Sequence, residues 1–261
     1  FRWRRMGLLR VILDCLVCSE NVAKQRRPQT LMIPLHDDNP TQRTPIVTMI
    51  FIGICVAVFL YQVNLPQEAA NLFAFQYGAI PAIVFGQASL PEEAVAFPAS
   101  LSLVTSMFLH GGWMHLLGNM LYLWIFGNNI EDAMGHAKFV AFYLLSGILA
   151  ALSHALTDPS SQIPMVGASG AISAVLGAYL LLFPRAHVLV LLPAIGMIRV
   201  AAGIVLGMWF ITQLISGGLS VGATGGGVAF FAHIGGFIAG MALIGLFKRK
   251  DVRFFSPGRS T

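Results

Sequence analysis

The clearest indication of fold class is the stretch VAFFAHIGGFIAGMALIGLF, residues 228–247. It holds twenty consecutive residues without a charge, and about 20 such residues span the hydrocarbon core of a bilayer as a helix. One histidine, His233, lies within this apolar run. Polar side chains are costly inside a membrane and point to a function by default. The stretch therefore predicts a membrane-spanning helix that carries a functional group.

Other parts of the chain contain further apolar runs that approach spanning length. Together with the first stretch they predict six helices, at 45–63, 111–127, 137–157, 167–184, 199–216 and 228–247. A competing run at 188–198 contains Pro193 and Gly196, so we interpret it as a turn that leads into the fifth helix. The chain is 56% hydrophobic and only 10% charged, whereas soluble domains carry about 25% charged residues. The sequence thus predicts an all-α membrane protein, a bundle of six transmembrane helices.

The distribution of basic residues predicts the orientation of this bundle. From Met32 onward, nine Lys and Arg side chains all fall on one side of the six runs, which the positive-inside rule assigns to the cytoplasm. The segments on the other side, 64–110, 158–166 and 217–227, contain no Lys or Arg. We therefore expect a multi-pass protein of the plasma or inner membrane, with both termini in the cytoplasm.

Composition divides the chain into four parts. Residues 1–31 hold seven of the sixteen Lys and Arg and form a doubtful basic extension, for which three interpretations stay open: an upstream extension foreign to the protein, a basic cytoplasmic arm, and a targeting segment. We expect a cytoplasmic segment at 32–44, the six-helix domain at 45–247 and a basic cytoplasmic tail at 248–261. Over 32–261 nine bases balance nine acids, so no nucleic-acid partner is expected.

The first outer segment, 64–110, is long and contains two apolar stretches, 69–77 and 79–87, that are too short to cross a membrane. Prolines punctuate the segment. We expect both stretches to lie in the plane of the membrane interface. A soluble outer loop without membrane contact is the alternative.

Three polar clusters lie near the outer ends of helices that run in the same direction. Ser169 lies in GASG, 167–170, at the start of the fourth helix, His115 and Asn119 lie early in the second, and His233 lies early in the sixth. Because these helices all run inward from the outer face, the clusters share one depth. Packing alone does not explain polar groups from three distant segments at one level.

Small residues predict how the clusters meet. His233, Gly236 and Gly240 share one face of the sixth helix, and Ser169 and Ser173 share a face of the fourth. Small faces let membrane helices approach closely, so packing across them brings Ser169 toward His233. The glycines that we expect to permit close packing around the site are Gly167, Gly170, Gly236 and Gly240.

A serine beside an imidazole predicts nucleophilic chemistry. We expect His233 to take the proton of Ser169 and then to protonate the leaving amine. Backbone N–H groups at the helix start, with His115 and Asn119, are expected to stabilise the oxyanion. An interhelical hydrogen-bond pair is the alternative for His115 and Asn119. No Asp or Glu lies in the outer part of these helices, so a Ser–His dyad is expected, in a wet cavity open to the outer face.

Neither a metal nor a cofactor is expected. The three histidines near the outer face are accompanied by no HExxH motif and no carboxylate ligand, which argues against a metalloprotease.

A small transporter or channel is a second alternative. It predicts inverted repeats or helices broken near the middle of the membrane, and the sequence shows no repeat.

At these residues the sequence resembles the rhomboid family of intramembrane serine proteases. GASG at 167–170 is similar to the family's nucleophile motif, AHIGGFIAG at 232–240 to its base motif, and LHGGWMHLLGN at 109–119 to its second-helix motif. The resemblance covers about 40–250 and implies a six-helix rhomboid-like bundle in the lipid bilayer. It implies cleavage of single-span or polytopic membrane proteins near the outer face, without metal or cofactor.

Two features depart from the family's pattern. A Trp-Arg pair that many rhomboids carry before the second-helix motif corresponds here to Leu101 and Ser102. A Tyr that some members place four residues after the nucleophile corresponds to Ser173. The first departure bears on the packing of the first outer segment and the second on the orientation of His233. An inactive rhomboid-like protein that binds membrane clients is therefore the alternative to a protease.

Overall fold

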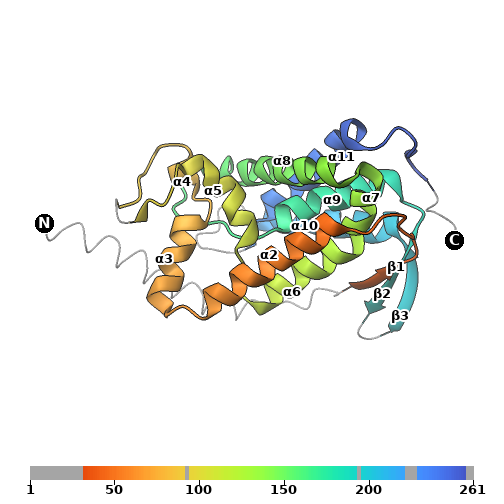
Figure 1. Cartoon of the computed structure of the whole chain (residues 1–261), viewed down its shortest axis with the longest axis horizontal. Coiled ribbons are helices and arrows are strands. Elements are labelled where there is room, and N and C mark those ends of the chain that lie inside the picture. Colours follow the sequence, from red (N-terminus) through yellow and green to blue (C-terminus); the bar gives the residue numbers. More distant parts are fainter. Residues whose placement is uncertain (1–31, 92–93, 193–194, 221–227, 257–261) are drawn as a thin grey trace, which may run out of the picture.

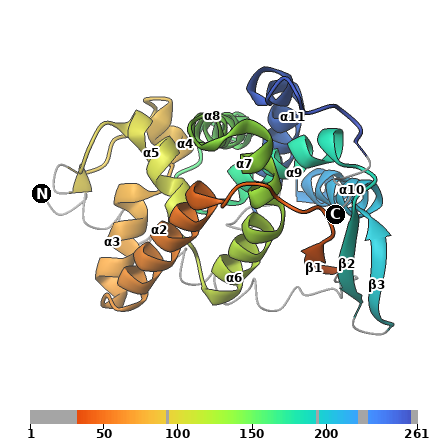
Figure 2. The same cartoon turned by 45° about the vertical axis from the view of Figure 1, so that its right-hand side comes forward.

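The computed structural model describes residues 32–91, 94–192, 195–220 and 228–256. The predicted extension at 1–31 and the last residues of the predicted tail lie outside the described residues. Helices make up most of the described chain, and a small sheet stands at one end of them (Figures 1 and 2).

Four helices of the described chain are long and apolar enough to cross a membrane. They are α2 (Ile46–Val63), α8 (His136–Ala155), α10 (Ala202–Ser220) and α11 (Phe230–Phe247). Each lies close to a run predicted from the sequence. These four helices make the chain a membrane protein by length and composition.

The two other predicted spans are shorter or compound. Helix α9 (Ser169–Leu182) has fourteen residues. Helix α6 (Trp113–Tyr122) continues through a π-helical turn, η3 (Leu123–Gly127), into α7 (Asn128–Met134). The predicted count of six spans adds these two helices to the four long ones.

Helix α9 lies at the centre of the bundle. Eleven of its fourteen residues are buried, and it packs mainly against α11 and α8. Gly236 and Gly240 of α11 face the backbone of Gly170 and Ala174 on α9. A helix that is largely apolar on every side suits this central place, because neighbouring elements cover its faces.

A three-stranded antiparallel sheet corrects the all-α prediction. Strand β1 (Ile33–Asp37) pairs with β2 (His187–Leu192), which pairs with β3 (Gly196–Ala201). The interpretation of 188–198 as a turn was wrong. Val188 and Val190 are buried while the residues between and beside them are more exposed, which is the two-residue period of a strand.

Asp37 joins this sheet to the bundle. The Tyr179 hydroxyl of α9 and the Asn129 side-chain amide of α7 both donate to Asp37 Oδ2, at 2.7 and 2.8 Å. Burial raises the pKa of the Asp37 carboxyl from 3.8 to about 6. The end of β1 is therefore fixed to two helices through one buried carboxyl group.

A second buried carboxylate holds the start of α2. The backbone N–H groups of Val47 and Thr48 donate to Glu131 at 2.9 and 2.8 Å, and the Thr48 hydroxyl donates at 2.7 Å. His136 Nδ1 lies 2.6 Å from the same carboxylate. Unpaired N–H groups and the positive dipole end of a helix favour an anion there, so Glu131 ties α2 to α7.

The end of the bundle opposite the sheet, which we call the loop end, carries short helices (Figures 1 and 2). They are α3 (Gln67–Tyr77), α4 (Pro81–Val84), α5 (Ala99–Thr105) and the 3₁₀ turn η2 (Ser106–Phe108). The apolar stretches noted in the sequence coincide with α3 and with the region of α4, and their in-plane position stays a prediction. A bridge between Ala79 and Met165 places this segment against the loop that enters α9.

Candidate active site

A hydrogen bond joins the first residue of α9 to the first turn of α11. Ser169 Oγ and His233 Nε2 are 2.8 Å apart, although 64 positions separate them in the sequence. A general base must lie about 2.6–3.2 Å from the nucleophile that it activates. The predicted proximity of these two side chains is therefore present in the fold.

Close packing of the two helices creates this contact. Gly236 lies three residues after His233 and faces the carbonyl group of Gly170, the residue after Ser169. Any Cβ at position 236 would collide with that carbonyl group. Glycine at 236 thus sets the spacing of the helix backbones at the level of the hydrogen bond.

A third polar side chain contacts the imidazole from α10. Gln213 Oε1 lies 2.8 Å from His233 Nδ1. Gln213 is not among the site residues predicted from the sequence. The signal that pointed to His233, a polar residue within an apolar run, applies to Gln213 as well.

Aromatic rings also restrain the imidazole. The ring centroid of Trp209, on α10, lies 5.9 Å from that of His233, and the Phe230 ring lies edge-on at 6.4 Å. Ser173 does not take this role, because its hydroxyl donates to the Ser169 carbonyl at 2.6 Å. Trp209 thus packs on His233, the place that the family pattern gives to a Tyr at position 173.

His115 lies beside the turn that leads to Ser169. Gly167 has φ +130°, and a Cβ there would lie 2.7 and 2.8 Å from His115 Cε1 and Nε2. A side chain at 167 would therefore displace the imidazole, and the left-handed backbone also favours glycine. The Gly167 N–H donates to the carbonyl of Ser106 at 2.8 Å, which holds the turn in place.

Asn119 lies one turn further along α6 and is only 8% exposed. Its Nδ2 has no hydrogen-bond partner within the described part of the chain. Buried donors are almost always paired, and an unpaired one costs about 1–3 kcal/mol. Asn119 therefore has a donor free for a further oxygen atom.

A small cavity of about 40 Å³ adjoins Ser169. Its lining includes Ser106, Met107 and Gly167. A cavity of about 10–15 Å³ is enough for one water molecule. Water can therefore reside beside the Ser169 hydroxyl.

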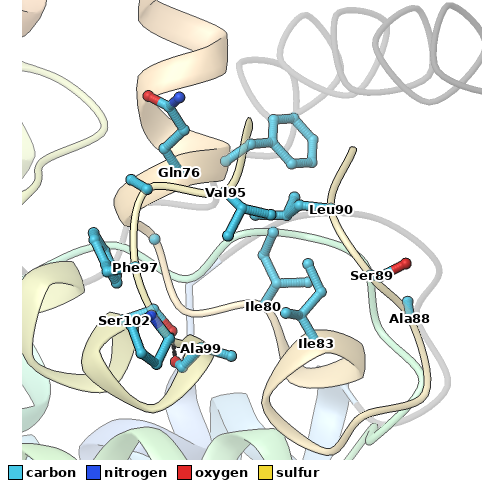
Figure 3. Close-up of a pocket in the computed structure, with 14 residues that line it drawn as sticks. Gln76, Ile80, Ile83, Ala88, Ser89, Leu90, Val95, Phe97, Ala99 and Ser102 are labelled. Atoms are coloured by element: carbon cyan, nitrogen blue, oxygen red, sulfur yellow. Dashed lines mark hydrogen bonds between the residues drawn. The ribbon is translucent and has the colours of Figure 1, made fainter. Parts of the chain in front are cut away.

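A larger cavity of about 500 Å³ lies at the loop end, and its lining does not include Ser169, His233 or Gln213. Figure 3 shows its lining, largely apolar, with Ile80, Leu90 and Phe97. Ser102 also lines it, and its hydroxyl donates to the Ala99 carbonyl at 2.6 Å. No lining residue pairs a nucleophile with a base, so this cavity is not the candidate site.

Histidine, cysteine and carboxylate side chains are the usual metal ligands in proteins. The described ranges contain no group of three or more His, Cys, Asp or Glu side chains that could hold a metal ion. The polar groups that the site does contain are the Ser169 hydroxyl, the His233 imidazole and the side-chain amides of Gln213 and Asn119.

The family model and the known proteins that match this chain carry the same family name. The family model described as "Rhomboid domain" matches residues 98–250, which is more than half of the chain and includes Ser169, His233, His115 and Asn119. The chain is 30% identical over 161 residues to Rhomboid protein 1, mitochondrial, of Saccharomyces cerevisiae, covering 59% of this chain and 43% of that protein.

Two further relatives are similar over part of their length. Identity to Presenilin-associated rhomboid-like protein A, mitochondrial, of Danio rerio is 33% over 178 residues, covering 61% of this chain and 44% of that protein. Identity to RHOMBOID-like protein 5 of Arabidopsis thaliana is 40% over 78 residues, covering 30% and 25%. The chain spans less than half the length of these relatives. On the extent of the family match, the chain belongs to the rhomboid family.

Proposed function

We propose that the protein is a serine endopeptidase of the rhomboid type, which hydrolyses peptide bonds in or near the transmembrane segments of other membrane proteins. The observation that carries the proposal is the 2.8 Å contact between Ser169 Oγ and His233 Nε2 at the start of a buried helix. Family membership and four candidate membrane spans support it.

The reaction begins when His233 Nε2 takes the proton of Ser169. The Ser169 oxygen attacks the carbonyl carbon of the scissile bond and forms a tetrahedral oxyanion. His233 then gives its proton to the leaving amine nitrogen, and the C–N bond breaks. Water next attacks the acyl ester, with His233 again taking and returning a proton, and releases the carboxylic acid and the free serine.

The oxyanion needs donors that are in place before the reaction. The backbone N–H groups at the start of α9 have no partner in the preceding turn of helix, and they lie beside Ser169. Asn119 Nδ2 and the His115 ring are the side-chain donors on α6. In other serine proteases one such donor contributes about 3–4 kcal/mol to transition-state stability.

The proposed function includes the type of membrane, the side to which the site opens and the class of substrate. Both termini face the cytoplasm of a plasma or inner membrane, and the site opens toward the outer face, because the basic residues favour that orientation. The substrates are single-span or polytopic membrane proteins. The small cavity beside Ser169 supplies room for the hydrolytic water.

The test is cleavage in a defined membrane. The full chain is reconstituted into liposomes with a model single-span substrate, and the products are identified by mass spectrometry. Wild type cuts near one membrane boundary, whereas Ser169→Ala and His233→Ala do not. Ser146→Ala is the matched control, because the buried Ser146 hydroxyl bonds only within α8. Cleavage that persists in Ser169→Ala would defeat the proposal.

A fluorophosphonate probe gives a second readout, since it labels an activated serine without a substrate. Labelling of wild type but not of Ser169→Ala is expected. A folded protein that neither reacts with the probe nor cuts, and that still retains a membrane client, would instead be an inactive rhomboid-like binder.

A further inference from the structure

We propose that Gln213 is a positioning residue that fixes the tautomer of His233, so that the reactive unit comprises three side chains from three helices. The inference rests on the proposed function and deepens it. It replaces the dyad expected from the sequence with a Ser–His–Gln arrangement that contains no acid.

The first observation is the pair of hydrogen bonds on the imidazole. Nδ1 contacts Gln213 Oε1 at 2.8 Å, and Nε2 contacts Ser169 Oγ at 2.8 Å. A carbonyl oxygen accepts hydrogen bonds and donates none, so Nδ1 carries the proton. A neutral imidazole has one N–H, so Nε2 has the free lone pair that receives the proton of Ser169.

The second observation fixes the direction of the Gln213 amide. The Thr212 hydroxyl donates to the Trp209 carbonyl at 2.6 Å, which leaves its lone pairs to accept. Gln213 Nε2 lies 3.4 Å from that hydroxyl oxygen. The amide nitrogen thus faces an acceptor, and Oε1 is left for the imidazole.

The reversed amide would have the opposite effect on the site. Its N–H groups would face Nδ1, the imidazole proton would move to Nε2, and His233 would offer no lone pair to Ser169. The direction of one neutral amide therefore decides whether His233 can act as a base.

The third observation is that α10 holds the ring at two points. Trp209 and Gln213 are four residues apart and therefore lie on one face of the helix, and both contact His233. The Trp209 contact restrains the plane of the His233 ring, and the Gln213 hydrogen bond restrains the rotation of the ring within that plane. The orientation of the base thus depends on α10 remaining packed against α11.

A neutral partner suits this environment. A carboxylate here would place an uncompensated negative charge within an apolar bundle, which is costly. An amide orders the imidazole and adds no charge. In a serine protease triad, loss of the correct tautomer lowers kcat by about 10⁴. We expect a smaller loss here, about 10- to 100-fold, because Gln213 stabilises the imidazolium less than an acid does.

The experiment uses variants that separate hydrogen bonding from bulk. Gln213→Met keeps the length of the side chain without an acceptor, and kcat should fall about 10- to 100-fold with KM near that of wild type. Gln213→Glu restores an acceptor oxygen and should recover part of the activity. Gln67→Met makes the same replacement at an exposed position on α3 and should leave cleavage unchanged.

Nitrogen-15 NMR of histidine-labelled protein reads the tautomer directly and needs no substrate. The signals of His233 are those that disappear in His233→Ala. Wild type should show a protonated Nδ1 and an unprotonated Nε2, and Gln213→Met a mixture of both tautomers. If Gln213→Met does not fold, Gln213→Asn is used, whose shorter amide cannot reach Nδ1, and the same mixture is expected.

A folded Gln213→Met that cuts at the wild-type rate, or that keeps the wild-type tautomer, would overturn the inference. This result is distinct from failure of the proposed function, which is signalled by cleavage in Ser169→Ala. The NMR result holds for an inactive protein as well, so the two proposals stand or fall separately.

Discussion

Gly240 of α11 lies against the backbone of Ala174 on α9, so close that a Cβ at position 240 would collide with the Ala174 carbonyl group. One turn earlier, Gly236 has the same relationship to Gly170. The two helices therefore touch backbone to backbone, and no flexible side chain lies between them to absorb a displacement. The Ser169–His233 hydrogen bond lies at the end of this shared face.

Gly240→Ala should impair both folding and cleavage. The added methyl group pushes α11 away from α9, and overpacking of this kind costs about 1–3 kcal/mol. The apparent unfolding temperature in detergent should fall, and cleavage of a model substrate should fall at least tenfold. Gly53→Ala on α2 is the control, because a Cβ added at position 53 would meet nothing within 4 Å. Wild-type stability in Gly240→Ala would contradict the role of the backbone contact.

Asn119→Ala should separate activity from stability. Loss of an oxyanion donor lowers kcat by about 10²–10³ and leaves KM nearly unchanged. Stability should not fall with it, because the deleted Nδ2 donor has no partner within the described part of the chain. Steady-state kinetics and thermal unfolding are measured on the same preparation. A parallel loss of both would favour the alternative that Asn119 serves an interhelical hydrogen bond.

Glu131→Gln should destabilise the bundle. The substitution removes the charge at the start of α2 and turns an acceptor into an amide nitrogen that faces N–H donors. Hydrogen bonds to charged groups contribute about 1.5–3 kcal/mol each, so we expect a loss of about 2–3 kcal/mol in denaturant titrations. Glu68→Gln, at an exposed position in the first turn of α3, is the control and should cost less than about 1 kcal/mol. An unaltered midpoint in Glu131→Gln would show that the carboxylate does not hold α2.

Asp37→Asn should remove a pH dependence. Because burial raises the pKa of Asp37 from 3.8 to about 6, the folded protein binds this proton more tightly than the unfolded chain. The tighter binding of this proton stabilises the folded state. Its contribution to the free energy of unfolding is complete below pH 3.8 and is lost as the pH rises through about 6. The groups that act on the carboxyl are Tyr179, Asn129, His36 and Asp38.

The measurement compares unfolding temperatures of wild type and Asp37→Asn at intervals from about pH 4 to pH 7. Titrations that the two proteins share cancel in the difference, so the difference reports Asp37 alone. Wild type should lose stability relative to the variant as the pH rises through that window. A difference that stays constant would show that Asp37 has the same proton affinity in both states.

The helices could be predicted because apolar length is a local property. Helices α2 and α11 end at the predicted residues, 63 and 247, and begin one and two residues after the predicted starts at 45 and 228. The sheet could not be predicted in this way, since a short apolar run such as HVLVLL at 187–192 fits a buried strand and a helix equally well. Its partner β1 also lies about 150 residues upstream, and no local pattern links the two segments.

The site also contains residues that could be predicted from the sequence and one that could not. Ser169 and His233 stand out because each is polar in an apolar run and each adjoins small residues. Gln213 has the first property only, and its part in the site depends on which helix α10 faces. That information arises from the packing of α10 on α11, where Trp209 and Gln213 meet one imidazole ring.

The position of β1 has a consequence for synthesis. Ile33 pairs with Leu191, and a ribosome adding about 5–20 residues per second needs roughly 8–30 s to make the chain between them. During that interval the nascent segment at 33–37 has no strand to join, while α2, α6, α8 and α9 are being made. Closure of the sheet therefore marks a late moment in biogenesis, after most of the helices have been translated.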